Sequence, residues 1–206
     1  MMTLQNKIAV ITGASGGIGA ATARLLSRQG ATVILMGRSK RKLGETLGAL
    51  AGRHDSFLLD VTSTEQVFAV MDQVIERYGR IDILINNAGY GVFEPFVEAS
   101  LETISGMMDV NYMGTVRCTK AVLPHMLRAG SGHIVNVASM AGKVGTAKSA
   151  GYSATKHAVI GFTNSLRQEL KGTGVYISAV NPGPVDTPFF DIADPSGNYV
   201  NHVRWF

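Results

Sequence analysis

The chain has 206 residues, 46% of them hydrophobic, which suits one sizeable α/β domain and is too apolar for a disordered chain. The formal net charge is +4, and no apolar run approaches the roughly 18 residues that a membrane span needs. Cys118 is the only cysteine, which excludes an internal disulfide. A free thiol is typical of a reducing compartment, so we expect a cytoplasmic protein.

Targeting and metal-binding signals are weak. The stretch MMTLQNKIAVITGASGG has no basic segment, only a short apolar run and no small-residue cleavage site, so we expect no signal peptide. The five histidines show no zinc-ligand spacing, and we expect no metal site.

Short β-rich runs alternate with helical patterns along the chain. We predict strands at about 7–12, 31–36, 56–60, 82–86, 133–138 and 175–180. We predict helices at about 17–29, 40–51, 64–78, 101–127 and 152–171, the third of them preceded by a capping box of Thr62 and Glu65. The strands are nearly continuous apolar runs, as expected when both faces of a sheet are covered. The sequence therefore predicts a single domain over residues 1–206, with a doubly wound parallel sheet and helices on both faces.

The basic residues are concentrated in one place. The stretch RSKRK at 38–42 holds four of the 19 basic residues, and the remaining 15 balance the 15 acidic ones. This distribution argues against a nucleic-acid-binding face. The cluster is either a solvated helix start or a local site for an anionic ligand.

The unusual motifs follow predicted strands, where open α/β sheets bind their ligands. They are TGASGGIG, NNAG, AS and NPGPVDT. The glycines of the first motif, 13, 16, 17 and 19, differ from the G-x-G-x-x-G spacing, but they allow a tight turn and a close approach of a pyrophosphate to a helix start. A glycine-rich turn without a ligand is the alternative.

Two polar side chains lie on helical stripes that we expect to be buried. Asn111 shares a stripe with Leu101, Ile104, Met108 and Thr115, and it is either a satisfied core amide or a site residue. Tyr152 and Lys156 head a second stripe, which continues with Val159, Thr163, Leu166 and Leu170. This pair either snorkels to water or is catalytic, in which case the ammonium should lower the pKa of the phenol.

With Ser139 placed 13 residues before Tyr152, these motifs together resemble the short-chain dehydrogenase/reductase family over about residues 5–190. The resemblance implies a Rossmann-type fold and hydride transfer between a nicotinamide cofactor and a carbonyl or alcohol substrate. It implies that Tyr152 is the general acid/base and that Lys156 binds the nicotinamide ribose and lowers the pKa of Tyr152. Ser139 would bind the substrate oxygen, and Asn111 would hold a water that links Lys156 to solvent.

The resemblance also implies cofactor contacts and an assembly. Besides Tyr152 and Lys156, the cofactor positions are Gly13, Ser15, Gly17, Ile18, Gly19, Asp60, Val61, Asn87, Ala88, Gly89, Pro182, Gly183, Val185 and Thr187. Family members usually form dimers or tetramers through the helices that correspond to 101–127 and 152–171. They usually run to about 250 residues, so we expect the polypeptide to continue past Phe206.

The cofactor preference follows from the end of the second predicted strand. NAD enzymes usually place a carboxylate about 20 residues after the glycine turn. Here Gly37 stands in that position and Arg38 and Ser39 follow, so no acid would repel a 2′-phosphate. We therefore expect NADP(H) to be preferred over NAD(H).

Two other functions remain open. An epimerase or dehydratase could use the same Tyr–Lys pair, although such relatives carry a larger substrate domain. A regulatory protein could bind NADP(H) without turnover, but it would not need an acid/base group. The substrate stays undefined, with Tyr90, Val92, Phe93, Met140 and Val144 as an expected apolar flank that could equally pack under a lid.

Overall fold

The computed structural model describes residues 4–197 and residue 199. Its strands are β1 (Ile8–Thr12), β2 (Thr32–Gly37), β3 (His54–Leu58), β4 (Ile83–Asn86), β5 (Gly132–Val137) and β6 (Val175–Val180). Its helices are α1 (Gly17–Arg28), α2 (Lys40–Leu47), α3 (Thr64–Tyr78), α4 (Leu101–Met108), α5 (Gly114–Ala129), α6 (Ala150–Glu169) and α7 (Phe189–Ala193), with a π-helix at Asp109–Met113 and a 3-10 turn at Met140–Gly142.

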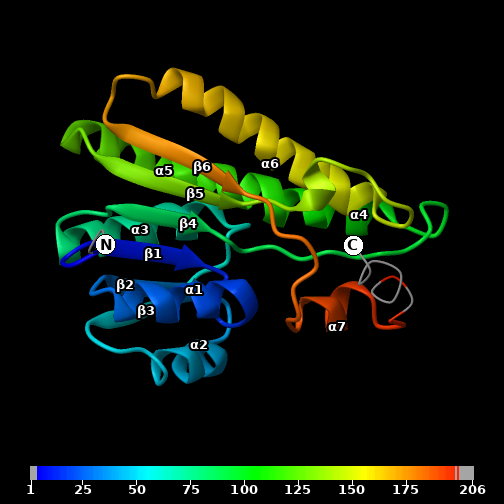
Figure 1. Cartoon of the computed structure of the whole chain (residues 1–206), viewed down its shortest axis with the longest axis horizontal. Coiled ribbons are helices and arrows are strands. Elements are labelled where there is room, and N and C mark those ends of the chain that lie inside the picture. Colours follow the sequence, from blue (N-terminus) through cyan, green and yellow to red (C-terminus); the bar gives the residue numbers. More distant parts are fainter. Residues whose placement is uncertain (1–3, 198, 200–206) are drawn as a thin grey trace.

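The six strands form one parallel sheet in the order β3-β2-β1-β4-β5-β6. This is the predicted doubly wound arrangement, in which the strand order reverses between β1 and β4. Because all strands run the same way, their carboxyl ends share one edge, and α7 lies beyond that edge (Figure 1). The motifs that follow the strands are therefore brought together.

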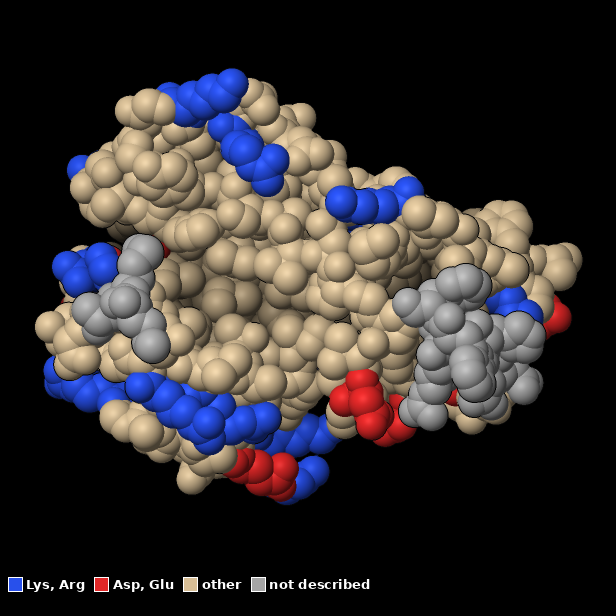
Figure 2. All heavy atoms as spheres, in the orientation of Figure 1, with Lys and Arg blue, Asp and Glu red and all other residues tan. Residues whose placement is uncertain are grey.

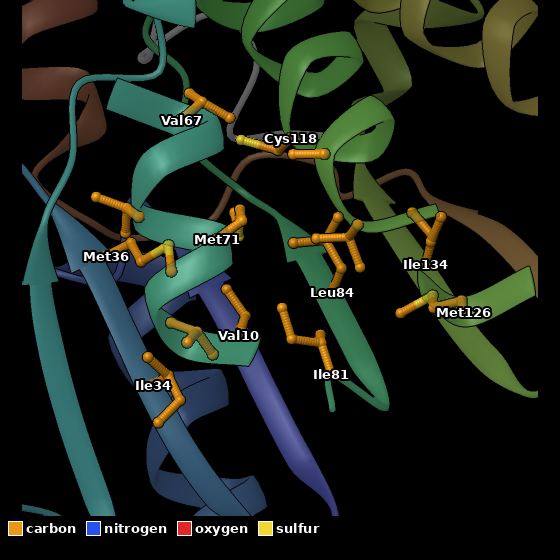
Figure 3. Close-up of a cluster of buried hydrophobic side chains, with 14 of the residues drawn as sticks. Val10, Ile34, Met36, Val67, Met71, Ile81, Leu84, Cys118, Met126 and Ile134 are labelled. Carbon is orange, nitrogen blue, oxygen red and sulfur yellow. The ribbon is translucent and has the colours of Figure 1, made fainter. Parts of the chain in front are cut away.

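Apolar side chains cover both faces of the sheet. On one face, α3 and α5 pack over the strands, and Figure 3 shows Met71 and Cys118 against Val10 and Leu84. On the other face, Ala23 of α1 and Leu43 of α2 pack with alternate residues of the same strands, such as Ile11 and Leu35. Both faces of β1 and β2 are buried, which explains why these strands are uninterrupted apolar runs.

Several predicted boundaries were wrong. Strand β3 begins and ends two residues early, and it is an edge strand whose partly exposed side chains weaken the pattern. Helix α2 ends at Leu47. The cap of α3 is Ser63, whose Oγ accepts a hydrogen bond from Gln66 N–H, whereas Thr62 donates its hydroxyl proton to Asp60.

The predicted helix over 101–127 is interrupted. Five residues, Asp109–Met113, form a π-helix between α4 and α5. A π turn holds one residue more than an α turn, so it rotates the following helix face by about 100°. The expected stripe therefore fails at its start: Leu101 is 79% exposed, whereas Asn111 and Thr115 are buried.

The stripe along α6 is as predicted. Its six members are all buried: Tyr152, Lys156, Val159, Thr163, Leu166 and Leu170. In the described part of the chain, no helix is long and apolar enough to cross a membrane. The expectation of a continuation past Phe206 concerns the segment that lies outside the described residues.

Candidate active site

A cleft of about 980 Å³ opens at the carboxyl edge of the sheet. This volume lies at the upper end of the range for small-molecule and cofactor sites. Most of the predicted site residues line it: Gly13, Ser15, Gly17, Ile18, Arg38, Asp60, Val61, Asn87, Ala88, Gly89, Ser139, Tyr152, Lys156, Pro182, Gly183, Val185 and Thr187. The hollow is visible in Figure 2, where the Lys and Arg side chains gather near α2.

Three predicted site residues do not line the cleft. Ser39 is the N-cap of α2 and accepts from Lys42 N–H. Gly19 lies under the glycine turn, where an added Cβ would stand 2.6 Å from both Asn87 Nδ2 and Gly13 O. Asn111 lies behind the cleft wall and bonds to neighbouring backbone. These residues shape the site from outside it.

Other lining residues were not predicted as site residues. They are Thr12, Gly16, Met36, Gly37, Lys42, Glu45, Leu59, Tyr90, Phe93, Val110, Val137, Ala138, Met140, Ala141, Val144, Thr146, Pro184, Pro188, Phe189, Phe190, Ile192 and Tyr199. The expected apolar flank supplies four of these, Tyr90, Phe93, Met140 and Val144, whereas Val92 does not line the cleft. Lys42 could have been chosen because it lies one helical turn after Ser39. The aromatic residues after Thr187 carried no sequence motif.

The glycine turn leaves the start of α1 open. Gly13 has φ +63°, and a Cβ there would stand 2.7 Å from Ala88 Cα. Gly16 is the N-cap of α1 without a capping side chain, and nothing lies within 4 Å of its Cβ position. Helices α2, α3 and α4, in contrast, are each capped by a serine. The free N–H groups and the open space at α1 fit the pyrophosphate of a dinucleotide.

Thr12 and Asn87 fasten the ends of β1 and β4 to each other. The Thr12 hydroxyl accepts from the N–H groups of Asn87 and Ala88, both at 3.0 Å. The Asn87 amide donates to the carbonyls of Thr12 and Gly13, also at 3.0 Å. The glycine turn is thus held rigidly at the point where the strand order reverses.

One end of the cleft is charged. Arg38 and Lys42 line it from the end of β2 and from α2, and Asp60 lines it from the loop after β3. A hydrogen bond from the Thr62 backbone N–H, aided by the Thr62 hydroxyl and the Arg38 charge, lowers the pKa of Asp60 against the opposing effect of burial. The charged end of the cleft therefore holds two cations, the Asp60 carboxylate engaged with Thr62, and Glu45, which pairs with Arg41.

Ser139, Tyr152 and Lys156 meet at the middle of the cleft. Tyr152 and Lys156 are almost fully buried on α6, with the Lys156 ammonium 5.7 Å from the Tyr152 ring centroid. Lys156 Nζ donates to the carbonyl of Val137 at 2.8 Å. Ser139 follows β5 and accepts from Ala141 N–H, and its side chain acts on the Tyr152 phenol by lowering the pKa of that group. The arrangement brings a proton donor, a hydroxyl and a cation together.

The pKa of Tyr152 moves in the direction opposite to that expected. Burial raises it to about 12, Ser139 opposes this, and the nearby Tyr199 adds to it. Burial lowers the pKa of Lys156 to about 8. The protein alone therefore keeps the phenol protonated at neutral pH, as a proton donor requires.

Three hydrogen bonds hold the Asn111 side chain. Its Oδ1 accepts from Tyr90 N–H at 2.9 Å, and its Nδ2 donates to Tyr90 O at 2.8 Å and to Thr155 Oγ1 at 3.0 Å. The π-helix thus joins the loop after β4 to α6, which carries Tyr152. The amide therefore has structural partners, and the water-holding role expected for Asn111 stays a prediction.

Arg117 fastens the π-helix to the loop after β3. Its guanidinium donates to the Asp109 carboxylate at 2.7 Å, to Val61 O at 3.2 Å and to Thr64 Oγ1 at 3.1 Å. Val61 lines the cleft, and Asp109 begins the segment that holds Asn111. Arg117 therefore connects the loop that lines the charged end of the cleft to the π-helix that holds Asn111.

A buried polar row crosses the sheet beneath the site. Asn86 Nδ2 donates to Thr119 Oγ1 at 3.1 Å and to Asn136 Oδ1 at 2.9 Å, and Asn136 Nδ2 donates to Thr163 Oγ1 at 2.8 Å. The two asparagines are register partners on β4 and β5. This row joins α5, the sheet and α6 just below the strand ends.

No group of three or more His, Cys, Asp or Glu residues among the described residues could hold a metal ion. Cys118 is buried in the core, and burial raises the pKa of its thiol to about 12, so it is not a reactive thiolate.

Comparisons with known proteins agree with this geometry. A family model described as short chain dehydrogenase matches residues 7–195. An uncharacterised oxidoreductase of Staphylococcus saprophyticus is 43% identical over 192 residues, which cover 91% of this chain and 82% of the relative. A 3-oxoacyl-(acyl-carrier-protein) reductase of Thermotoga maritima is 38% identical over 190 residues, covering 91% of this chain and 77% of the relative.

Solved structures are similar over most of their length. Levodione reductase has a TM-score of 0.90 at 31% identity, covering 94% of this chain and 79% of that one. An actinorhodin polyketide ketoreductase with NADPH has a TM-score of 0.85 at 39% identity, covering 91% of this chain and 74% of that one. A short chain dehydrogenase/reductase of Burkholderia phymatum in complex with NAD has a TM-score of 0.89 at 32% identity, covering 93% of this chain and 70% of that one. Both cofactors therefore occur among similar structures.

Proposed function

This chain belongs to the short-chain dehydrogenase family of oxidoreductases, and from that premise we propose that it transfers a hydride between NADP(H) and a carbonyl or alcohol substrate. The observation that carries the proposal is the meeting of Ser139, Tyr152 and Lys156 in one cleft with the uncapped start of α1. A turn that merely connected a strand to a helix would not need this set of groups.

In the proposed reaction, a bound nicotinamide supplies or accepts the hydride. Ser139 hydrogen-bonds the substrate oxygen and holds it near Tyr152. During reduction, the Tyr152 hydroxyl gives its proton to that oxygen, and its raised pKa keeps the proton available. Lys156 stabilises the phenolate that forms, since a nearby ammonium favours the charged phenol. During oxidation the same groups act in reverse.

The preference for NADP(H) rests on Arg38 and Lys42. Both line the cleft at the end of β2, where an NAD enzyme usually carries an acid. Gly37 has no side chain to oppose a 2′-phosphate. Lys42 is added to the residues expected here, since the Ser39 hydroxyl oxygen accepts from Lys42 N–H and caps α2.

A cytoplasmic homo-oligomer completes the proposal. The reduced, buried Cys118 supports the location. Helix α5 exposes Leu127, an apolar side chain of the kind that subunit contacts bury. Light scattering on the purified protein measures the assembly.

The deciding experiment follows NADPH oxidation against a panel of aldehydes, ketones and quinones. Wild-type protein should oxidise NADPH with at least one of them. Tyr152→Phe should lower turnover by at least about a hundredfold, in line with the loss of general acid catalysis, while fluorescence titration still shows NADPH binding. Binding without any turnover by wild type would favour a sensor, and product formation without net NADPH consumption would favour an epimerase or dehydratase.

A further inference from the structure

Four aromatic side chains line the cleft beside Tyr152, and two of them, Phe93 and Phe189, contact its ring. Phe93 lies edge-on to Tyr152 at 5.5 Å between centroids and is stacked with Tyr199 at 4.2 Å. Phe189 lies 5.7 Å from Tyr152, and Phe190 lies 5.3 Å from Phe189. We call these four residues together with Thr146 the aromatic lobe.

The chain folds the aromatic lobe from three separate segments. Phe93 follows β4, and its N–H donates to the carbonyl of Ala193 at 2.8 Å, which docks α7 against the loop. The neighbouring Glu94 N–H donates to Lys148 O at 3.0 Å, which ties the same loop to the segment after Ser139. The lobe is therefore held by backbone hydrogen bonds as well as by its rings.

The polar groups of the lobe satisfy each other. The hydroxyls of Thr146 and Tyr199 form a hydrogen bond of 2.6 Å. Asp194 does not line the cleft, and its carboxylate accepts from Tyr199 N–H and from the Ser196 hydroxyl. Among the described lining residues, the charged side chains are Arg38, Lys42, Glu45, Asp60 and Lys156. None of these belongs to the lobe.

This distribution selects against charge on the substrate. A carboxylate, phosphate or ammonium in the lobe would lose its hydration and find no partner of opposite sign there. An apolar ring would instead gain hydrophobic burial and edge or face contacts with the four aromatic rings.

Resting on the proposed function, we propose that the aromatic lobe binds a neutral, apolar ring beside the reacting carbon, so that the substrate is an uncharged ring ketone or its alcohol. In the reduction, the carbonyl carbon gains a hydride from the reduced cofactor, and the π electrons of the carbonyl move to its oxygen. That oxygen takes the proton of Tyr152, and the phenol regains a proton from solvent. The products are the ring alcohol and the oxidised cofactor.

The test compares three ring ketones that differ only at the distal carbon: 4-methylcyclohexanone, methyl 4-oxocyclohexanecarboxylate and 4-oxocyclohexanecarboxylate. The methyl ester is the size-matched neutral control for the carboxylate. We expect kcat/KM for the ester to exceed that for the carboxylate by at least about 30-fold, because desolvating the charge is uncompensated. The kcat/KM for 4-methylcyclohexanone should likewise exceed that for the carboxylate.

A variant then locates the effect. Thr146→Arg places a cation in the lobe and should reduce the ester-to-carboxylate ratio by at least about tenfold. Ser131→Arg adds the same charge to the exposed turn before β5, at the opposite end of the strand, and should leave the ratio unchanged. If Thr146→Arg does not fold, the wild-type ratio still decides.

The outcomes separate this inference from the proposed function. A wild-type ratio near one, or a preference for the carboxylate, overturns the substrate class and leaves the hydride-transfer function intact. Failure of all three ring ketones while another carbonyl compound is reduced has the same meaning. Absence of NADPH oxidation with every carbonyl compound overturns the proposed function and this inference with it.

Discussion

Arg117 donates from Nη2 to Oδ1 of Asp109 at 2.7 Å, and the same guanidinium reaches the loop that follows β3. A residue on α5 thus fixes two parts of the cleft wall that are separated by about 50 positions in the chain. Neither Asp109 nor Arg117 belongs to one of the sequence motifs. Asp109 nevertheless begins the π-helix that carries Asn111.

The first prediction concerns this clamp. Arg117→Met keeps much of the aliphatic stem and removes the hydrogen bonds, so the free energy of unfolding should fall by about 1–3 kcal/mol. The loop that bears Val61 should also loosen, raising the dissociation constant for NADPH by about 3- to 10-fold. Urea denaturation and fluorescence titration measure these effects. Arg128→Met, on the exposed side of the same helix, is the control and should change neither quantity.

The second prediction concerns cofactor choice. A charge-assisted hydrogen bond from Arg38 or Lys42 to a 2′-phosphate would contribute about 1.5–3 kcal/mol, so one or two such bonds imply a preference for NADPH of roughly tenfold to a thousandfold or more. The ratio of kcat/KM for NADPH and NADH should fall in Lys42→Ala and fall further in Gly37→Asp/Arg38→Ala. Lys40→Ala removes an exposed charge outside the cleft lining and serves as the control. Equal use of both cofactors by wild type would mean that the basic cluster at 38–42 is only a solvated helix start.

The third prediction concerns pH and stability. Burial lowers the pKa of Lys156 to about 8 from an ordinary value of 10.5, so between these values the unfolded chain binds more protons than the folded one. Stability due to Lys156 should therefore rise as pH rises from 8 toward 10, and the full cost of burying the ammonium applies below pH 8. Tyr152 has the opposite effect at higher pH. Because its pKa is raised from 10 to about 12, its contribution to the free energy of unfolding should fall as pH rises from 10 to 12.

Lys156→Met isolates this effect. The free energy of unfolding of wild type, minus that of the variant, should increase from pH 8 to pH 10 in urea denaturation. Lys171→Met, which removes an exposed lysine after α6, controls for the loss of one positive charge. If the difference in free energy of unfolding between wild type and Lys156→Met stays constant or falls from pH 8 to pH 10, the lowered pKa of Lys156 is wrong.

The fourth prediction concerns the polar row beneath the site. Asn136 is fully buried between Asn86 and Thr163, and Asn136→Ala removes one hydrogen bond from each of these partners and leaves a cavity. The free energy of unfolding should fall by about 2–4 kcal/mol. Asn164→Ala, on the exposed face of α6, should change it by no more than about 0.5 kcal/mol. A small effect of Asn136→Ala would mean that water satisfies the row.

Much of the fold and the site could be predicted because the signals were local. Continuous apolar runs marked the buried strands, and motifs after those strands identified the cleft, including Tyr152 and Lys156 at one-turn spacing. The aromatic lobe could not be predicted, since Phe93 and Phe189 meet only through the docking of α7 on a distant loop. The raised pKa of Tyr152 could not be predicted either, because burial, which a helical stripe does not quantify, outweighs the lowering effect of Ser139.

The π-helix between α4 and α5 has an evolutionary consequence. A π turn corresponds to a single inserted residue in an α-helix, and here that insertion sets the register in which Asn111 reaches the backbone of Tyr90. Point substitutions can alter the side chains of this segment, but only a deletion can return the helix to uniform winding. Such a deletion would turn every later residue of α5, including the buried Cys118 and Val122, by about 100°. Shortening this segment by one residue would therefore require the core around α5 to repack as well.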